Sequence, residues 1–188
     1  MLPRRNILIF HSGALGDFVV TWPLAVALGR LHPQSRVMYI VQSQKGKLAE
    51  RVLGVESRDV ETGQWHRLFA TDATLADVSL RTLTGAQRVV SFVADSDGVW
   101  TNNVRRLAPF ADLHILEPRP RERYTQHVTQ FIADQLQEDR VLAASVGPIL
   151  RSIADRGVGT TWRGGAGVVL HPGAGAIEKC WPVHHWIE

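Results

Sequence analysis

The residues best suited to chemistry lie in a short turn near the amino terminus. An apolar run over residues 7–10 leads into the segment HSGALGD, which contains two glycines and ends at Asp17. A strand, a glycine-containing turn and a helix form the usual phosphate-binding pattern, in which a carboxylate is unexpected. At the carboxyl end of a parallel sheet, where open α/β folds bind their ligands, Asp17 would be placed to act as a general base. The alternative is that Asp17 only caps the helix that follows.

Two nucleotide-binding templates fail on this turn. Gly13 and Gly16 give only G-x-x-G, whereas the dinucleotide fingerprint needs three glycines. The apolar run over residues 36–41 is not followed by the acid that would hold an adenosine ribose, and no Walker A loop is present. The sequence therefore disfavours a nicotinamide-dependent oxidoreductase and disfavours P-loop chemistry.

A second glycine-rich loop, HPGAGAIEKCWP, is better suited to phosphate. A predicted strand ends at His171, and the following segment, Gly173, Ala174 and Gly175, would let backbone amides approach an anion closely. Lys179 adds a full positive charge nearby. This combination predicts a diphosphate site, although an ordinary glycine-rich loop with an exposed lysine gives the same pattern.

Other charged residues indicate weaker candidates. The tripeptide from Asp95 to Asp97 matches the Asp-x-Asp of metal-dependent glycosyltransferases, but its place between a strand and a helix favours helix capping. No zinc-type spacing occurs among the eight histidines, and we expect no metal site. The loop EPRPRERY clusters Arg119, Arg121 and Arg123, which are candidates for contact with an anionic acceptor or with lipid headgroups, the alternative being a solvated charged loop. Lys45 and Lys47 follow the second predicted strand and are separate candidates for contact with an acidic substrate.

The elements that must position these residues alternate between apolar, β-rich runs and helical patterns. Strands this uniformly apolar are expected in a parallel sheet covered on both faces, so we predict an α/β, doubly wound, Rossmann-like fold. The predicted strands are 6–11, 36–41, 87–93, 112–116 and 167–171, with a weaker one at 56–60. The predicted helices are 17–31, 46–52, 74–83, 98–107, 124–137 and a helix from Pro182 onward.

The chain is predicted to contain one domain and the start of another. Glycines become dense between about residues 147 and 165, just before a fresh strand, loop and helix. We predict an amino-terminal domain over 1–150, a linker over 151–166 and the opening of a second domain over 167–188. About 20 residues cannot bury a core, so we expect the second domain to be incomplete in this chain.

Composition limits the classes of protein to consider. The net charge of the 188-residue chain is +3, too small to argue for nucleic acid binding. Cys180 is the only cysteine, so a reducing cytoplasm is the simplest location. No stretch approaches the roughly 18 apolar residues of a membrane span. We expect a soluble, cytoplasmic protein, for which a peripheral position at the inner face of the cytoplasmic membrane stays open.

The two glycine-containing motifs together resemble glycosyltransferase family 9, the ADP-heptose:lipopolysaccharide heptosyltransferases. That family has a turn of the form S-x-x-L-G-D and a proline six residues after the Asp, which SGALGDFVVTWP fits from Ser12 to Pro23. Its second domain opens with H-P-G-A followed by K-x-W-P, and HPGAGAIEKCWP fits with Lys179 in register. Cys180 stands where the family commonly has a basic residue.

The resemblance implies a GT-B architecture, with this chain supplying the amino-terminal lobe and the first strand, loop and helix of the second lobe. It implies inverting, metal-independent transfer of a heptose or related sugar from an ADP-activated donor to a lipopolysaccharide-type glycolipid, with no cofactor. Asp17 would be the general base, and Ser12, Gly13 and Gly16 would form the turn on the acceptor side. Lys179 and the amides of residues 173–175 would stabilise the departing diphosphate.

Two hypotheses follow from these motifs. In the first, the chain belongs to a glycosyltransferase whose isolated amino-terminal half does not turn over. In the second, it is a non-catalytic GT-B lobe that binds a glycan or a partner chain. A carboxylate whose pKa is near the ordinary value of about 3.9 cannot deprotonate a sugar hydroxyl in advance. We therefore expect Asp17 to accept the proton of the acceptor hydroxyl late in the reaction. By then the hydroxyl oxygen has begun to bond to an oxocarbenium-like anomeric carbon.

Overall fold

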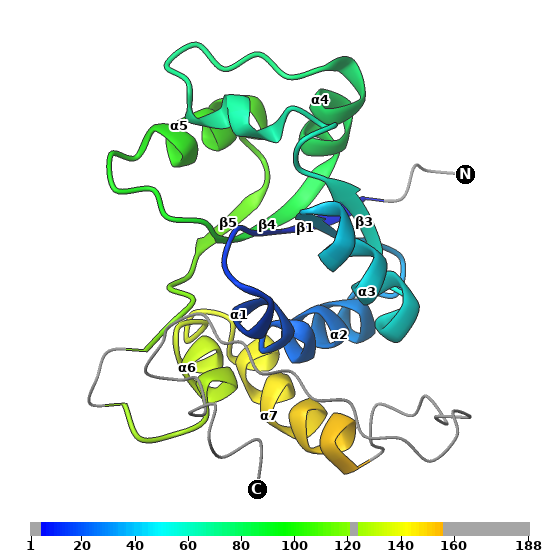
Figure 1. Cartoon of the computed structure of the whole chain (residues 1–188). Coiled ribbons are helices and arrows are strands. Elements are labelled where there is room, and N and C mark those ends of the chain that lie inside the picture. The colour runs from blue at the N-terminus through cyan, green and yellow to red at the C-terminus, as the bar shows by residue number, and fades with distance from the viewer. Residues whose placement is uncertain (1–4, 121–123, 156–188) are drawn as a thin grey trace, which may run out of the picture. The chain divides into compact units, whose positions relative to one another are not determined.

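The computed structural model describes residues 5–120 and 124–155 of the chain, and these residues form one α/β unit (Figure 1). The predicted strand at 167–171, the helix from Pro182 and the predicted second domain lie outside the described residues. In chain order the elements are β1 Asn6–His11, α1 Leu15–Val19, α2 Trp22–Leu31, β2 Arg36–Val41, α3 Ser43–Leu53, β3 Glu56–Asp59, the 3-10 helix η1 Trp65–Phe69, α4 Asp77–Thr84, β4 Ala86–Phe92, α5 Val99–Leu107, β5 Asp112–Ile115, α6 Val128–Asp134 and α7 Arg140–Asp155.

The five strands form one parallel sheet in the order β3-β2-β1-β4-β5. β1 is central, and all six of its residues are buried. This order, with helical crossovers on both faces, is that of a doubly wound Rossmann-like sheet, so the predicted fold class is confirmed. The two most uniformly apolar strands, β1 and β2, begin and end at the predicted residues.

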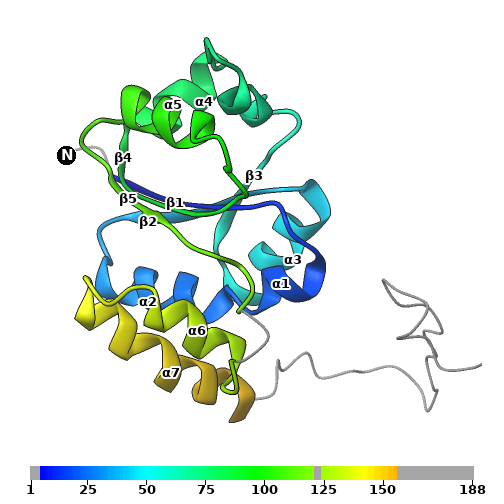
Figure 2. The same ribbon diagram turned by 90° about the vertical axis from the view of Figure 1, so that its left-hand side faces the viewer.

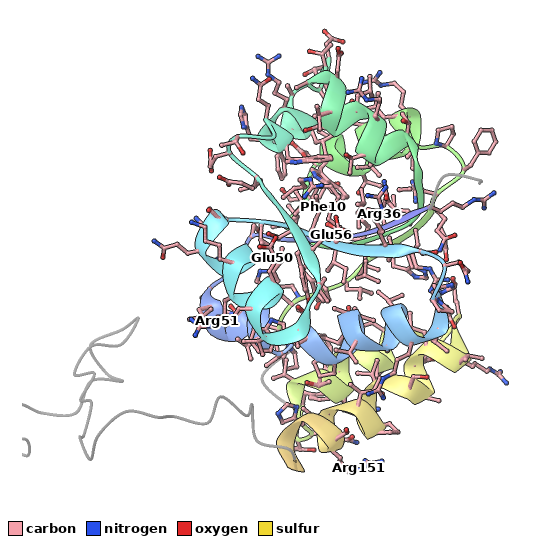
Figure 3. All side chains as sticks on the ribbon, turned by 90° about the vertical axis from the view of Figure 1, so that its right-hand side faces the viewer. Phe10, Arg36, Glu50, Arg51, Glu56 and Arg151 are labelled. Carbon is pink, nitrogen blue, oxygen red and sulfur yellow. The ribbon has the colours of Figure 1, made fainter. Side chains whose placement is uncertain are left out.

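Alternate residues of β1 face two separate cores. Ile7 and Ile9 pack on the side covered by α2, α3, α6 and α7, whereas Leu8 and Phe10 pack on the side covered by η1, α4 and α5. Figure 2 shows the sheet between these two layers of helices. Phe10, labelled in Figure 3, makes edge-to-face contacts with Trp65 and Trp100, at centroid distances of 5.3 and 5.1 Å. Burial on both faces explains why β1 reads as a continuous apolar run.

The predicted single helix over 17–31 is wrong, because the chain breaks between α1 and α2. Pro23, with no backbone N–H, would remove a hydrogen bond in the interior of one long helix. It stands instead in the first turn of α2, where that N–H is not needed. At the break, the buried hydroxyl of Thr21 donates to the carbonyl of Phe18 at 2.7 Å.

Helix α7 was not predicted. Gly147 and Pro148 lie inside it, and such residues ordinarily indicate a loop. The helix is held by tertiary packing: its Leu142, Val146 and Ile149 are buried, and it packs against α2 and α6. The predicted end of the first domain at residue 150 falls inside α7. Within the described residues, no helix combines the length and apolar character needed to span a membrane.

Candidate active site

The loops that follow β1 and β4 leave the sheet at its carboxyl edge, on either side of the point where the strand order reverses. Chain order runs from β1 toward β3 on one side and from β4 toward β5 on the other. Such a switch point is where open α/β sheets bind ligands. The turn of residues 12–14 and helix α1 follow β1 here, so Asp17 stands on the side of the sheet expected for a functional residue.

Asp17 forms an ion pair with Arg119, 102 residues away in the sequence. Nη2 of Arg119 lies 2.6 Å from Oδ2 of Asp17, and Nε lies 3.3 Å from Oδ1 and 3.2 Å from Oδ2. The Asp17 side chain is 22% exposed, whereas that of Arg119 is 70% exposed. Arg119 therefore contacts a carboxylate of its own chain, and its predicted contact with an anionic acceptor stays a prediction.

Asp17 does not occupy the N-cap position of α1, so the capping alternative is wrong in that form. The N-cap is Ala14, and Asp17 is the third residue of the helix. Hydrogen bonding from Arg119 lowers the pKa of Asp17. Partial burial opposes this shift, and the charge of Arg119 and the amide of Ala14 support it. Asp17 is consequently ionised throughout the neutral pH range and is a weak base.

His11 is a member of this cluster that was not predicted. Its ring is 4% exposed and lies beside the rings of Phe18 and Phe92, at centroid distances of 5.5 and 5.9 Å. Neither ring nitrogen has a hydrogen-bond partner among the described residues. Burial, helped by the positive charge of Lys45, lowers the pKa of His11 to about 4, so the ring is neutral at pH 7. The available sequence signal was a histidine ending an otherwise apolar strand.

Gly13 brings the turn close to both His11 and Asp17. A Cβ atom at Gly13 would lie 3.0 Å from Cε1 of His11 and 3.4 Å from Oδ2 of Asp17. Its carbonyl accepts a hydrogen bond of 2.5 Å from Nζ of Lys45, in the first turn of α3. A side chain at Gly13 would therefore make the His11 ring shift by a few tenths of an ångström. The predicted contact residue Lys45 is hydrogen-bonded to the turn itself.

The other predicted site residues are less informative. Ser12 and Gly16 are exposed, and a Cβ at Gly16 would meet nothing within 4 Å, so no packing requires that glycine. The remaining predicted residues lie outside the described residues; they are Arg121, Arg123, Gly173, Ala174, Gly175 and Lys179.

The Asp95–Asp97 segment caps helix α5. Asp95 accepts hydrogen bonds from the amides of Trp100 and Thr101 at 3.0 and 2.8 Å, and Asp97 accepts one from Val99 at 3.2 Å. Burial opposes the charge of Asp95, but these hydrogen bonds outweigh it and lower its pKa. The capping interpretation is confirmed. No group of three or more potential metal ligands occurs within the described ranges.

The order of the strands defines a Rossmann-like α/β domain, and His11, Asp17 and Arg119 lie together at the carboxyl edge of its sheet. No protein-family model matches the sequence, and none of the curated proteins matches it significantly. The fold is similar to a solved structure described as the glycosyl transferase family 9 from Veillonella parvula DSM 2008, with a TM-score of 0.50 and 12% sequence identity. The match covers 99% of this chain and 59% of that chain. At this identity the likeness shows a shared fold.

Proposed function

We propose that this chain is the acceptor-side part of an inverting, metal-independent glycosyltransferase in which Asp17 is the general base. The observation that carries the proposal is the place of Asp17 at the carboxyl edge of the sheet, next to the switch point, in a fold similar to that of a family 9 glycosyl transferase. The S-x-x-L-G-D motif supports the same family independently of the fold. By this resemblance the architecture is GT-B, and the chain spans 59% of the similar structure.

In the proposed reaction, a hydroxyl oxygen of the acceptor attacks the anomeric carbon of the sugar from the face opposite the diphosphate. The new carbon–oxygen bond forms as the bond to the diphosphate breaks, and the leaving group keeps the electron pair. The hydroxyl proton passes to Asp17. Because the lowered pKa makes Asp17 a weak base, it takes the proton late, when charge on the sugar has already made the hydroxyl acidic.

The donor is a nucleotide sugar, by resemblance ADP-heptose, and the acceptor is an anionic glycolipid of the lipopolysaccharide type. Lys179 and the amides of residues 173–175 would stabilise the departing diphosphate. By the same resemblance, the chain would act in the cytoplasm at the inner face of the membrane. No cofactor is required by this chemistry.

The test is a transfer assay with the protein expressed from its whole reading frame, using ADP-heptose and a deacylated lipopolysaccharide core as donor and acceptor. We expect release of ADP that depends on the acceptor. Asp17→Asn should reduce this release by about 10²–10⁴-fold, the usual contribution of a positioned base. The exposed Asp97→Asn is the matched control and should retain the activity. Unchanged transfer by Asp17→Asn would exclude the general-base role.

The alternative is a lobe that binds a glycan or a partner chain without catalysis. Binding and transfer assays together distinguish such a binding lobe from an enzyme. Binding of the lipopolysaccharide core by the 188-residue chain, with no transfer by the product of the whole reading frame, would support the binding module. Binding of ADP-heptose by residues 1–155 alone would contradict the proposed donor site at Lys179.

A further inference from the structure

The guanidinium of Arg119 contacts both carboxylate oxygens of Asp17. Nε is shared between the two oxygens and Nη2 binds Oδ2 at 2.6 Å. A general base must accept a proton on one of these oxygens, and a hydroxyl must reach it first. In the free chain the Arg119 guanidinium already occupies hydrogen-bonding positions on both oxygens and competes with an incoming hydroxyl. Under the proposed function, Asp17 accepts the proton more readily when this contact weakens as the acceptor binds.

The two partners differ in how firmly the fold holds them. Asp17 is 22% exposed and belongs to α1, whereas Arg119 is 70% exposed and follows β5. Within residues 5–120 and 124–155, Asp17 is the one side chain that binds the Arg119 guanidinium. Ion pairs with an exposed partner are weak, because water competes and ordering a long side chain costs entropy. Arg119 is thus the partner that can leave.

Arginine also binds phosphate and carboxylate with similar geometry. Its planar donors pair with either group through two parallel hydrogen bonds. An anionic group on an acceptor would compete with Asp17 for the same donors.

The other charged or titratable groups near the turn do not replace Arg119. His11, at the end of β1, is buried and neutral at pH 7. Lys45, on α3, donates to the carbonyl of Gly13. Among the described side chains, Arg119 is the one that forms an ion pair with Asp17.

We propose that Arg119 is a positioning residue that holds Asp17 ionised and covered in the free chain, and that moves to an anionic group of the acceptor to uncover it. The exchange is a property of this chain alone, and its role in catalysis rests on the proposed function. An acceptor with an anion close to the reacting hydroxyl would bind Arg119 and thereby free Asp17 to accept the hydroxyl proton. An acceptor without that anion would leave Asp17 paired with Arg119.

The test follows the carboxyl carbon of Asp17 by NMR in chain labelled with ¹³C-aspartate, with its signal identified by its loss in Asp17→Asn. The pKa of Asp17 is measured in the wild type and in Arg119→Gln, with inorganic phosphate or with sodium chloride at equal ionic strength. We expect Arg119→Gln to raise this pKa. Phosphate should move the wild-type pKa toward the value of the variant, and should leave the variant unchanged.

Three further measurements make the test specific. Arg119→Lys should keep part of the pKa shift, because charge remains while the fork of donors is lost. Arg105→Gln, on the exposed face of α5, is the matched control and should respond to phosphate like the wild type. If phosphate leaves the wild-type pKa unchanged, or moves it equally in Arg119→Gln, the exchange does not occur.

The outcome is separable from that of the transfer assay. A phosphate-dependent shift without any sugar transfer would overturn the proposed function and leave the exchange intact. In a protein that does transfer sugar, Arg119→Gln should raise KM for an anionic acceptor several-fold. It should also move the acidic limb of the kcat/KM profile to higher pH, a change that a purely structural role would not produce.

Discussion

The hydroxyl groups of Thr21 and Tyr39 lie 2.9 Å apart in the core, joining the break between α1 and α2 to strand β2. Thr21 also donates to the carbonyl of Phe18 at 2.7 Å, and both hydroxyl-bearing residues are fully buried. The pair fixes the end of the short helix that carries Asp17. Burial raises the pKa of Tyr39, so its hydroxyl is protonated at neutral pH.

Removing one hydroxyl of this pair should be costly, and removing both should cost less than the two single losses added together. Thr21→Val leaves the Tyr39 hydroxyl buried without a partner, which costs about 1–3 kcal/mol of unfolding free energy. In Thr21→Val/Tyr39→Phe no polar atom of the pair remains, so the double variant should lose less than the sum of the two single variants. Denaturant unfolding measures the coupling. Additive losses would mean that the two hydroxyls do not interact.

Two glycines inside helices should respond to alanine in opposite directions. A Cβ at Gly46 on α3 would lie 2.8 Å from Cβ of Ser57, whose hydroxyl is held by Glu50 at 2.7 Å. Gly46→Ala should therefore cost about 1–3 kcal/mol. At Gly29 on α2 the nearest atom would lie 3.9 Å away, and Gly29→Ala should add up to about 1 kcal/mol through helix propensity.

A second substitution checks the cause at Gly46. Gly46→Ala/Ser57→Gly removes the side chain that the new methyl group would meet and should recover part of the lost stability. Thermal unfolding of the wild type, Gly46→Ala, Ser57→Gly and the double variant gives the comparison. If the double variant is no more stable than Gly46→Ala, the new methyl group is strained against an atom other than those of Ser57.

Stability should fall as the pH is lowered through the range set by His11. Its pKa is about 4 in the folded chain and 6.5 as the ordinary value, so between these values the unfolded chain binds more protons. The contribution of neutral His11 to the free energy of unfolding is fully present above pH 6.5. It is lost progressively toward pH 4, by roughly 3 kcal/mol in total. His11→Met should remove this slope, as measured by urea unfolding at a series of pH values.

The exposed His66 on η1 supplies the control for that experiment. His66→Gln should retain the wild-type dependence between pH 6.5 and 4. Below about pH 4 a separate loss is expected in all three proteins. There, carboxylates with lowered pKa, such as Asp17 and Asp95, take up protons as the pH falls through their folded-state values. A slope that persists in His11→Met would assign it to another group.

Loss of the Asp95 cap should destabilise α5. Asp95→Ala leaves the amides of Trp100 and Thr101 without their acceptor and should cost about 0.5–2 kcal/mol. Ser96→Ala, at an exposed position between the two aspartates, should change stability by less than about 0.5 kcal/mol. Added Mn²⁺ should leave the Tm unchanged. A rise in Tm that Asp95→Ala abolishes would restore the metal interpretation.

The elements best predicted from the sequence are those whose local pattern agrees with their burial. β1 and β2 are apolar runs bounded by polar residues, and Asp95 stands where a cap is expected. Helix α7 was missed because tertiary packing holds Gly147 and Pro148 in a helix that their propensities oppose. The contact between Asp17 and Arg119 was not predictable, since it depends on the path of a loop 102 residues further along the chain.

The central place of β1 also has a consequence for the order in which the chain folds. Its neighbour β2 follows within about 30 residues, because Asn6 pairs with Arg36, but its other neighbour is distant, because Asn6 also pairs with Ala86. During synthesis one edge of β1 therefore stays unpaired until β4 has left the ribosome. An open, apolar edge of this kind is prone to intermolecular pairing. Slow translation before residue 86 should therefore favour aggregation of the nascent chain.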